Sequence, residues 1–417
     1  MGDYLKLYQN CDVILLAEVF QEFRRKSLEN FELDPVHFIT SAQLTFNAGL
    51  KMTKVELKLL HNVNDYPWFE KQIRGGICFL TKRYVRANNP LIPALYDSSK
   101  PCNYILPLDV VNLYGSVMLS CLPEGNFSWL SKDEISKFNV FNYGMESNVG
   151  YFVECDLEYP VEIHDYTNSF PLAPDHLVIN YEMLSSYSQK LCDDFNLKQT
   201  LPTRKLTPNF FPKRNYVVHY LNLKFYLSMG IKLIKIHRVM AFTQSRWLQP
   251  YIGNLHQKRV SAKDTFSKSF FKKMINSFFG RLMLNVRKRT KIVGALDSKT
   301  CEKYLNNPLL ESFHSVNDDF VLFKMHMPNL ILDKPIYAGF CILELSKLKM
   351  YELYYNNFKK HYREKCQLLY IDTDSLYLNI YTQGNVYSEL KEKFEEILDL
   401  SNFNSHHEAY SEVKKTN

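Results

Sequence analysis

The chain has 417 residues, 46% of them hydrophobic, which is more than one core normally organises and predicts two or more subdomains. Its formal net charge of +7 suits a polyanionic partner but is also common among proteins that bind none. The nine cysteines include no C-x-x-C pair, which argues against a zinc ribbon and against a disulfide framework. No apolar run approaches the roughly 20 residues of a membrane span, so we expect an intracellular, soluble protein with no membrane partner.

The first part of the chain holds three recognisable segments. DVILLAEVFQEFRRKSL, residues 12–28, predicts an amphipathic helix with the apolar stripe Val13, Leu16, Val19, Phe20 and Phe23. IRGGICFLTKRYVRANN, residues 73–89, has paired glycines beside basic residues, so its backbone can approach a phosphate closely. YILPLDVVNLYGSVML, residues 104–119, predicts an apolar strand up to Val111 and then the start of a helix.

The middle of the chain, residues 122–248, is rich in Pro, Asn and Tyr and is typical of an inserted region with few regular elements. Within it we expect a strand at residues 151–159 and a helix at residues 215–230 that ends at Gly230. The basic segment after it, residues 251–285, predicts a helical pair because apolar residues recur at every fourth position: Phe266, Phe270, Met274 and Phe278.

The last part of the chain combines a helix and a hairpin. Residues 338–358 predict an amphipathic helix. QLLYIDTDSLYLNI, residues 367–380, predicts two apolar strands flanking a tight acidic turn.

Acidic residues at the ends of the apolar strands are the first candidates for chemistry. Asp372 and Asp374 occupy alternate positions of the hairpin and therefore point to one side. Such a pair can hold a cation, although Asp and Thr also favour turns for local reasons alone. Asp109 ends a separate strand and, taken alone, is best explained as a strand-ending or helix-capping residue. Two Mg²⁺ ions need carboxylates from separate strands to stabilise an in-line displacement at phosphorus, a requirement that Asp109 and Asp374 together meet.

A basic helical face is the second candidate. Lys268, Lys272 and Asn276 recur at every fourth position of KSFFKKMINSFFG and share one face. Stacked lysines repel one another, and an anion such as a triphosphate would relieve that repulsion. A lysine pair by itself is more often a solvated surface.

In combination and in this order, the segments resemble the motifs of family B DNA polymerases across most of the chain. DVVNLYGSVM, residues 109–118, resembles the family's first motif; KKMINSFFG, residues 272–280, resembles its K-x-x-x-N-S-x-Y-G fingers motif; and YIDTDS, residues 370–375, resembles its Y-x-D-T-D-S palm motif. The resemblance implies DNA-directed DNA synthesis, a nucleotidyl transfer of dNTPs to a primer 3′-hydroxyl with two Mg²⁺ ions, or Mn²⁺ in their place. Its implied partners are a DNA primer-template and dNTPs.

The resemblance also implies residue roles. It assigns catalytic carboxylates to Asp109, Asp372 and Asp374, metal ligation to Asp109 and Asp374, nucleotide contacts to Leu113, Tyr114, Lys268, Lys272 and Asn276, and template or DNA contacts to Gly75, Gly76, Thr373, Ser375 and Gly280. In this family the aromatic ring at the position of Tyr114 packs under the sugar and excludes a 2′-hydroxyl.

The spacing of the motifs indicates a branch of the family. Asp109 and Lys272 are 163 positions apart, which resembles the protein-primed branch with its extra region for a terminal-protein primer. HDYTNSFPLAPDH, residues 164–176, and IHRVMAFTQSRWLQPYIGN, residues 236–254, are similar to polymerases of large self-replicating transposons and related viruses. This branch fits either a nuclear location or a viral or mobile-element replication site.

The chain departs from the family pattern at several positions. Asn112 and Gly115 stand where Ser and Pro are usual, which predicts a less rigid loop, and Phe279 stands where Tyr is usual. Tyr8 and Asp12 resemble the third motif of the proofreading exonuclease, whose first two motifs would precede Met1, so we expect no proofreading. After the palm hairpin there is no K-x-Y motif, and we expect no thumb.

The predicted fold class is therefore α+β: a polymerase-like palm with an antiparallel sheet, helical fingers, and an insertion between the first and second polymerase motifs. In chain order we expect an exonuclease remnant at 1–30, a connecting region with the glycine pair at 31–103, palm at 104–160, an insertion resembling a terminal-protein region at 161–249, fingers at 250–288, a second insertion at 289–335 and palm again at 336–417. Two other functions fit parts of the pattern. A two-metal nuclease would need no triphosphate cradle, whereas an inactive remnant of a mobile-element polymerase would bind DNA only.

Overall fold

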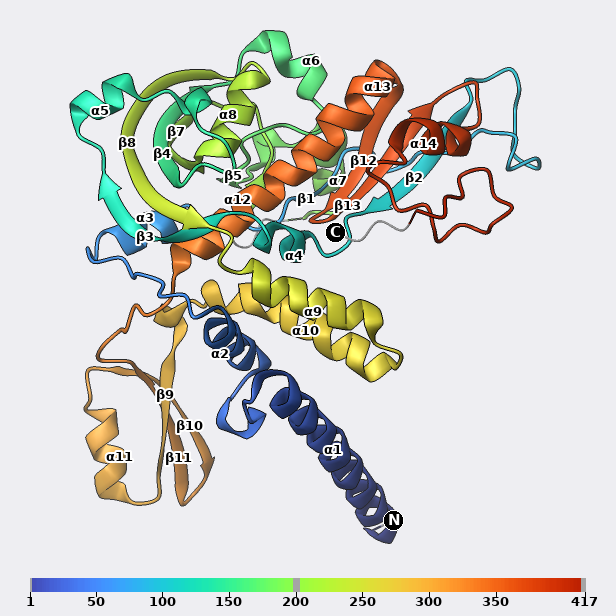
Figure 1. The fold of residues 1–417 in the computed structure, drawn as a ribbon. Helices are drawn as coiled ribbons and strands as arrows, with labels where there is room; N and C mark the ends of the chain where they lie inside the picture. Colours follow the sequence, from blue (N-terminus) through green and yellow to red (C-terminus); the bar gives the residue numbers. More distant parts are fainter. Residues whose placement is uncertain (1, 198–202, 414–417) are drawn as a thin grey trace.

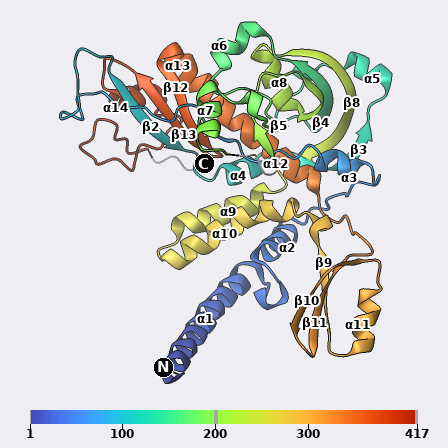
Figure 2. The same ribbon diagram turned by 180° about the vertical axis from the view of Figure 1, so that it is seen from behind.

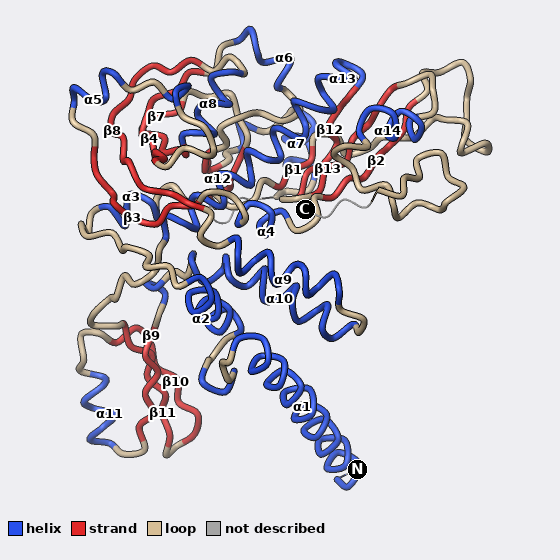
Figure 3. The backbone as a smooth tube through the Cα atoms, in the orientation of Figure 1, coloured by secondary structure: helices blue, strands red, loops and turns tan. Residues whose placement is uncertain are grey.

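The computed structural model describes residues 2–197 and 203–413, which form helices and antiparallel sheets (Figure 1). The helices are α1 (Gly2–Phe31), α2 (Ser41–Thr53), α3 (Asp65–Glu70), α4 (Leu113–Met118), α5 (Lys132–Lys137), α6 (His164–Thr167), α7 (Ser186–Asp194), α8 (Tyr220–Ser228), α9 (Gln249–Ser261), α10 (Thr265–Leu282), α11 (Ser298–Leu305), α12 (Ile336–Glu352), α13 (Lys360–Tyr362) and α14 (Val386–Phe394), with a π-helical segment, η6 (Leu353–Lys359), between α12 and α13. The strands, red in Figure 3, are β1 (Cys78–Leu80), β2 (Asn103–Asp109), β3 (Leu122–Trp129), β4 (Val149–Glu158), β5 (Asp175–Val178), β6 (Arg204–Thr207), β7 (Lys213–His219), β8 (Lys232–Ser245), β9 (Thr290–Ala295), β10 (Leu310–Asn317), β11 (Phe320–His326), β12 (Cys366–Asp372) and β13 (Ser375–Tyr381). Every helix of these described residues is too short or too polar to cross a membrane.

The first sheet has the antiparallel order β1-β12-β13-β2. The hairpin predicted for residues 367–380 is confirmed as β12 and β13, and the strand predicted from Tyr104 is confirmed as β2. β2 lies at an edge of the sheet, where Pro107 removes no ladder hydrogen bond from a further neighbour. Asp109 and Ser375 pair across β2 and β13, so the end of β2 lies beside the hairpin turn.

The second sheet has the order β3-β8-β4-β7 and occupies most of the region predicted as irregular. The strand predicted at residues 151–159 is confirmed as β4, but the helix predicted at residues 215–230 is wrong for its first five residues. There β7 pairs with β4, Val218 opposite Val153, and the helix α8 begins only at Tyr220. β-branched valines with a strand partner favour the extended form over the helix.

The helix α12 lies between the other elements, and the prediction that it is amphipathic is wrong. It packs against α3, α4, α8 and α10 and against β3 and β7, while η6 packs against β12. Because neighbours cover it on every side, nearly all of its residues are buried, and an apolar stripe on one face would not be enough.

The predicted helical pair is confirmed as α9 and α10, which pack with α2 below the first sheet in Figure 1. Phe270, Met274 and Phe278 of α10 are buried, as their spacing predicts. The hydroxyl of Thr45 in α2 donates a hydrogen bond to the carbonyl of Met274 at 2.8 Å, which fixes α2 against α10.

Two parts of the chain project from this body in both ribbon views (Figure 2). The helix α1 is longer than predicted. Its Val13 and Leu16 are exposed, while Phe23 packs edge-on against Phe270 at 5.6 Å between ring centroids. Residues 290–326 form a second projecting unit, in which β10, β11 and β9 pair beside α11 around their own small core of Ala295, Phe323 and Met325.

Candidate active site

The candidate site is built where β2 ends beside the β12–β13 turn. Asp109 ends β2, Asp372 ends β12 and Asp374 lies in the turn. The hydroxyl of Ser375 donates a hydrogen bond to Asp109 Oδ1 at 2.7 Å, across 266 positions of the chain, and the amide of Val110 donates to the carbonyl of Asp374 at 2.8 Å. The structure therefore brings the three predicted carboxylates to one edge of the sheet.

The turn itself has a strained backbone. Thr373 has φ +58°, a left-handed conformation that is uncommon for a β-branched residue. Its amide donates to the carbonyl of Ile77 at 2.9 Å, and the amide of Asp374 donates to the carbonyl of Asp372 at 2.6 Å. The segment that contains Gly76 and Ile77 thus packs against the turn and is hydrogen-bonded to it through Ile77.

Gly76 is required by this contact. A Cβ atom built on Gly76 would lie 2.5 Å from Thr373 Oγ1, whereas a Cβ on Gly75 would meet nothing within 4 Å. The two predicted glycines are therefore not equivalent: Gly76 packs on the turn, and Gly75 faces open space.

Negative charge accumulates at the site. Partial burial raises the pKa of Asp374 above its ordinary value; the charge of Asp109, and after it that of Asp372, raises the pKa further, while Lys272 acts in the opposite direction. A divalent cation at these carboxylates would relieve the repulsion, so the residues fit a hard, oxygen-seeking ion. Within residues 2–197 and 203–413 no group of three or more His, Cys, Asp or Glu side chains could hold a metal ion. Mg²⁺ is commonly bound by only one or two carboxylates together with substrate phosphates, which matches this arrangement.

The two departures in the first motif fit each other. Asn112 has φ +54°, a left-handed conformation that Asn tolerates, and its side-chain amide lies where a Cβ of residue 115 would stand. A side chain at position 115 would overlap that amide, so Gly115 accommodates Asn112. Lys349 of α12 donates a hydrogen bond to Ser116 Oγ at 2.8 Å and ties α4 to the buried helix. The Asn112 side chain thus packs against Gly115, and Lys349 holds Ser116. That this loop is less rigid than usual stays a prediction.

Tyr114 joins the first motif to the predicted fingers helix. Its ring stacks on that of Phe279 in α10, with centroids 4.6 Å apart and planes inclined by 7°. Burial raises the pKa of the Tyr114 hydroxyl, and the nearby charge of Asp374 raises it further. Its neighbour Leu113 is buried and anchors the start of α4. Phe279, which departs from the family pattern, thus supplies the ring on which Tyr114 stacks.

The basic face of α10 is present as predicted. Lys268, Lys272 and Asn276 are exposed and follow one another at every fourth position of the helix. The charge of Lys272 lowers the pKa of Asp374, an effect weaker than those of burial and of the charges of Asp109 and Asp372, which raise it. Gly280 is exposed near the end of the same helix, with open space around it.

Other predicted residues lie elsewhere. Tyr8 and Asp12 are exposed on the projecting half of α1, where the ring of Tyr8 stacks on Tyr4, and the structure does not bring them to the carboxylates (Figure 1).

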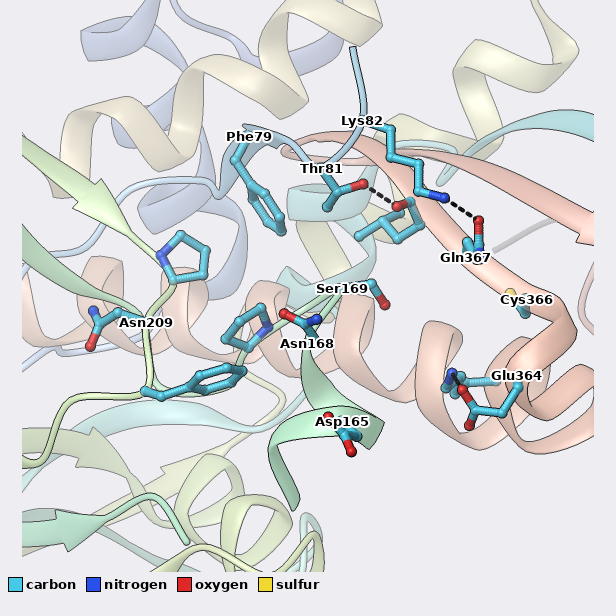
Figure 4. Close-up of a pocket in the computed structure, with 15 residues that line it drawn as sticks. Phe79, Thr81, Lys82, Asp165, Asn168, Ser169, Asn209, Glu364, Cys366 and Gln367 are labelled. Atoms are coloured by element: carbon cyan, nitrogen blue, oxygen red, sulfur yellow. Dashed lines mark hydrogen bonds and ion pairs between the residues drawn. The ribbon is translucent and has the colours of Figure 1, made fainter. Parts of the chain in front are cut away.

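A cavity of about 560 Å³ lies at the other end of β12, between the first sheet and the loops at residues 168–171 and 208–210 (Figure 4). Its lining includes Phe79, Lys82, Asn209 and Gln367, and Lys82 donates to Gln367 Oε1 at 2.7 Å. None of the three candidate carboxylates lines it. The cavity is thus separate from the candidate active site.

Three charged residues in the core near the turn were not predicted from the sequence. Arg74, Glu344 and Lys347 are all buried. The signal was present, because Glu344 and Lys347 interrupt an apolar helix at a spacing of three, and Arg74 directly precedes the glycine pair.

Comparison with known proteins identifies the family. The sequence model described as DNA polymerase type B, organellar and viral, matches residues 3–376. No curated protein sequence matches the chain. Among solved structures, an orthorhombic crystal form of phi29 DNA polymerase is similar with a TM-score of 0.48 and 13% identity, covering 84% of this chain and 50% of that one. The phi29 polymerase complexed with primer-template DNA in the post-translocation state gives a TM-score of 0.49 and 13% identity, with 84% and 50% coverage.

The chain thus spans about half of the length of these phi29 polymerase chains, with 50% of each covered. The family assignment rests on the sequence match, which extends over nearly the whole chain. The chain belongs to the type B DNA polymerases of the organellar and viral kind.

Proposed function

We propose that this chain is a DNA-directed DNA polymerase that transfers a nucleotide from a dNTP to a primer 3′-hydroxyl. The observation that carries the proposal is the hydrogen bond that Ser375 donates to Asp109, which joins the end of β2 to the turn of Asp374. The charge of Asp374 acts on the ionisation of Tyr114, and the charge of Lys272 acts on that of Asp374. A nuclease would need the carboxylates, but it would need neither the stacked rings of Tyr114 and Phe279 nor the basic face of α10.

The carboxylates have distinct roles in this proposal. Asp109 and Asp374 would hold the catalytic cations, and Asp372 would support them from the end of β12. Two divalent cations, when bound, would activate the primer hydroxyl and stabilise the charge on the leaving pyrophosphate. Ser375 keeps one oxygen of Asp109 oriented through its hydrogen bond, so the carboxylate does not have to be ordered during the reaction.

The nucleotide would lie between α4 and α10. Lys272 would contact its triphosphate, with Lys268 and Asn276 along the same exposed face. Tyr114, braced from behind by Phe279, would form the floor under the sugar. A rigid ring at that position leaves little room for a 2′-hydroxyl, which would favour dNTPs.

The same proposal assigns regions of the chain. Residues 104–160 and 336–417 would form the palm and residues 250–288 the fingers, while Gly75, Gly76, Thr373, Ser375 and Gly280 would border the template or primer strand. The region 161–249 would hold a terminal-protein primer in the manner of the protein-primed branch. In the structure its strands β7 and β8 share a sheet with β3 and β4, so this region would be continuous with the palm.

Primer extension on a singly primed template with Mg²⁺ and dNTPs tests the proposal. We expect extension by the parent chain and none by Asp374→Asn. Asp165→Asn, which removes a carboxylate beside the separate cavity, is the matched control and should leave extension unchanged. A folded parent chain that binds primer-template but extends nothing would contradict the proposed activity.

A further inference from the structure

A charged pair is buried in α12, close to the catalytic turn. Lys347 Nζ lies 3.1 Å from Glu344 Oε1, and the side chains are 4% and 0% exposed. Burying two charges costs several kcal/mol per ion, which the attraction between them offsets only in part. A well-packed apolar pair would serve the core as well or better. Packing alone therefore does not explain why these two charged residues lie in the core.

The lysine points to the backbone just before the glycine pair. Its ammonium group donates to the carbonyl of Arg74 at 2.9 Å and to the carbonyl of Leu343 in its own helix at 3.0 Å. Arg74 is itself buried: its guanidinium group donates to the carbonyl of Val217 at 2.9 Å and lies 3.6 Å from the ring centroid of Tyr216. Arg74 is thus fixed through its side chain by the second sheet and through its carbonyl by Lys347.

From Arg74 the connection to the turn is short. Gly76 packs against the side chain of Thr373, and the next carbonyl, that of Ile77, accepts the amide of Thr373. Gly76, Thr373 and Lys347 all line one small cavity, so the side chain of Lys347 lies next to the turn. The left-handed backbone of Thr373 is costly by itself and persists only while its surroundings hold it.

We propose that Lys347, oriented by Glu344, is a positioning residue: by fixing the Arg74 carbonyl it holds Gly76 and Ile77 under Thr373 and so places Asp372 and Asp374. This inference rests on the proposed polymerase function for its kinetic consequence, but its structural content does not depend on activity. The charged pair supplies a directional hydrogen bond to a backbone carbonyl, which an apolar pair of the same volume cannot supply.

The test uses the double variant Glu344→Leu with Lys347→Met, which keeps the volume of the core and removes both charges. Lys213→Met is the matched control, because Lys213 is also buried but bonds to Asn209. Hydrogen exchange at the Thr373 amide should accelerate about tenfold or more in the double variant and not in the control. An unchanged Thr373 amide in the folded double variant would overturn the inference, whether or not the chain is active.

The kinetics of nucleotide addition test the positioning role of Lys347 independently of hydrogen exchange. In single-nucleotide addition we expect kcat of the double variant to fall by about 10- to 100-fold with little change in KM for dNTP, because the carboxylates are displaced while the nucleotide contacts remain. If Lys347 acts through Gly76, adding Gly76→Ala to the double variant should cost little more, since both changes disturb one contact. The positioning role would be contradicted if Gly76→Ala lowered kcat by the same factor in the double variant as in the parent chain. It would also be contradicted if kcat of the double variant equalled that of the parent chain.

A variant with smaller effects on packing guards against misfolding. Glu344→Gln with Lys347→Gln keeps polar side chains at both positions, yet the shorter amide does not restore the ammonium contact. The same acceleration at Thr373 is expected, and protection equal to that of the parent chain would refute the proposal. Absence of polymerase activity in the parent chain would count against the proposed function. The exchange rate at the Thr373 amide would still decide whether Lys347 positions the turn.

Discussion

Replacing Gly76 with alanine would insert a methyl group directly against the turn that carries Asp372 and Asp374. The new Cβ would lie 2.5, 2.8 and 3.0 Å from Oγ1, Cγ2 and Cβ of Thr373. Rotating the threonine side chain relieves the first two contacts but not the third, because the Cβ is fixed to the backbone. Comfortable contacts between carbon atoms lie at about 3.5–4.0 Å, so Thr373 must move by roughly 0.5–1 Å.

The turn cannot move freely, because the Thr373 amide is bonded to Ile77 and the Asp374 carbonyl accepts the amide of Val110. The displacement should therefore reach the carboxylates. A shift of about 1 Å in catalytic groups can cost on the order of 100-fold in rate, which corresponds to about 2.7 kcal/mol in the activation free energy. Overpacking should also lower the free energy of unfolding by about 1–3 kcal/mol.

The assay is single-nucleotide primer extension under single-turnover conditions, with thermal unfolding measured on the same preparations. Gly253→Ala in α9 is the matched control, because an added Cβ there meets nothing within 4 Å. A Gly76→Ala enzyme with the parent rate would refute the claim that the glycine segment positions the turn.

Three further outcomes follow from the site. Asp374→Asn should abolish extension yet raise Tm at neutral pH without cations. The raised pKa of Asp374 means that the folded state disfavours the carboxylate; this cost is fully present above the folded pKa and vanishes as the pH falls toward the ordinary value of 3.8. An unchanged or lowered Tm at pH 7 would contradict this prediction. Tyr114→Ala should admit ribonucleotides more than it slows dNTP addition, by up to about 100-fold in relative kcat/KM; unchanged sugar discrimination in an active enzyme refutes its role. Lys272→Ala should lower kcat/KM for dNTP by about 10- to 100-fold, the loss expected for a charge-assisted hydrogen bond of about 1.5–3 kcal/mol, and parent kinetics would argue against a phosphate contact.

The strand ends that carry Asp109, Asp372 and Asp374 could be predicted from the sequence because their determinants are local, whereas the roles of these residues came from the family resemblance. The strand ending at Asp109 and the hairpin around Asp374 are short apolar runs with polar ends, and each folds as its own pattern indicates. The basic face of α10 follows in the same way from a spacing of four. What no local pattern reveals is the register that places Asp109 opposite Ser375.

The errors arose where tertiary packing outweighs local preference. Residues 215–219 continue into a helix, but their partner is β4, which lies far away in the chain, and the valines follow the sheet. The helix α12 contains polar residues that look like a solvent face, although they are buried and bonded to other parts of the fold, as Lys347 is to Arg74. The match between Asn112 and Gly115 also needs three-dimensional coordinates, because it depends on a left-handed backbone.

The proposed polymerase function depends on Asp109 and Asp374 holding the cations for nucleotide transfer together. It is tested most directly by anomalous diffraction from Mn²⁺ in a crystal of the chain with primer-template DNA and a non-hydrolysable dNTP. We expect manganese between these two carboxylates, at coordination distances near 2.1 Å, and its loss in Asp374→Asn. A bound dNTP with manganese coordinated elsewhere, or with Asp109 and Asp374 too far apart to share the site, would contradict it.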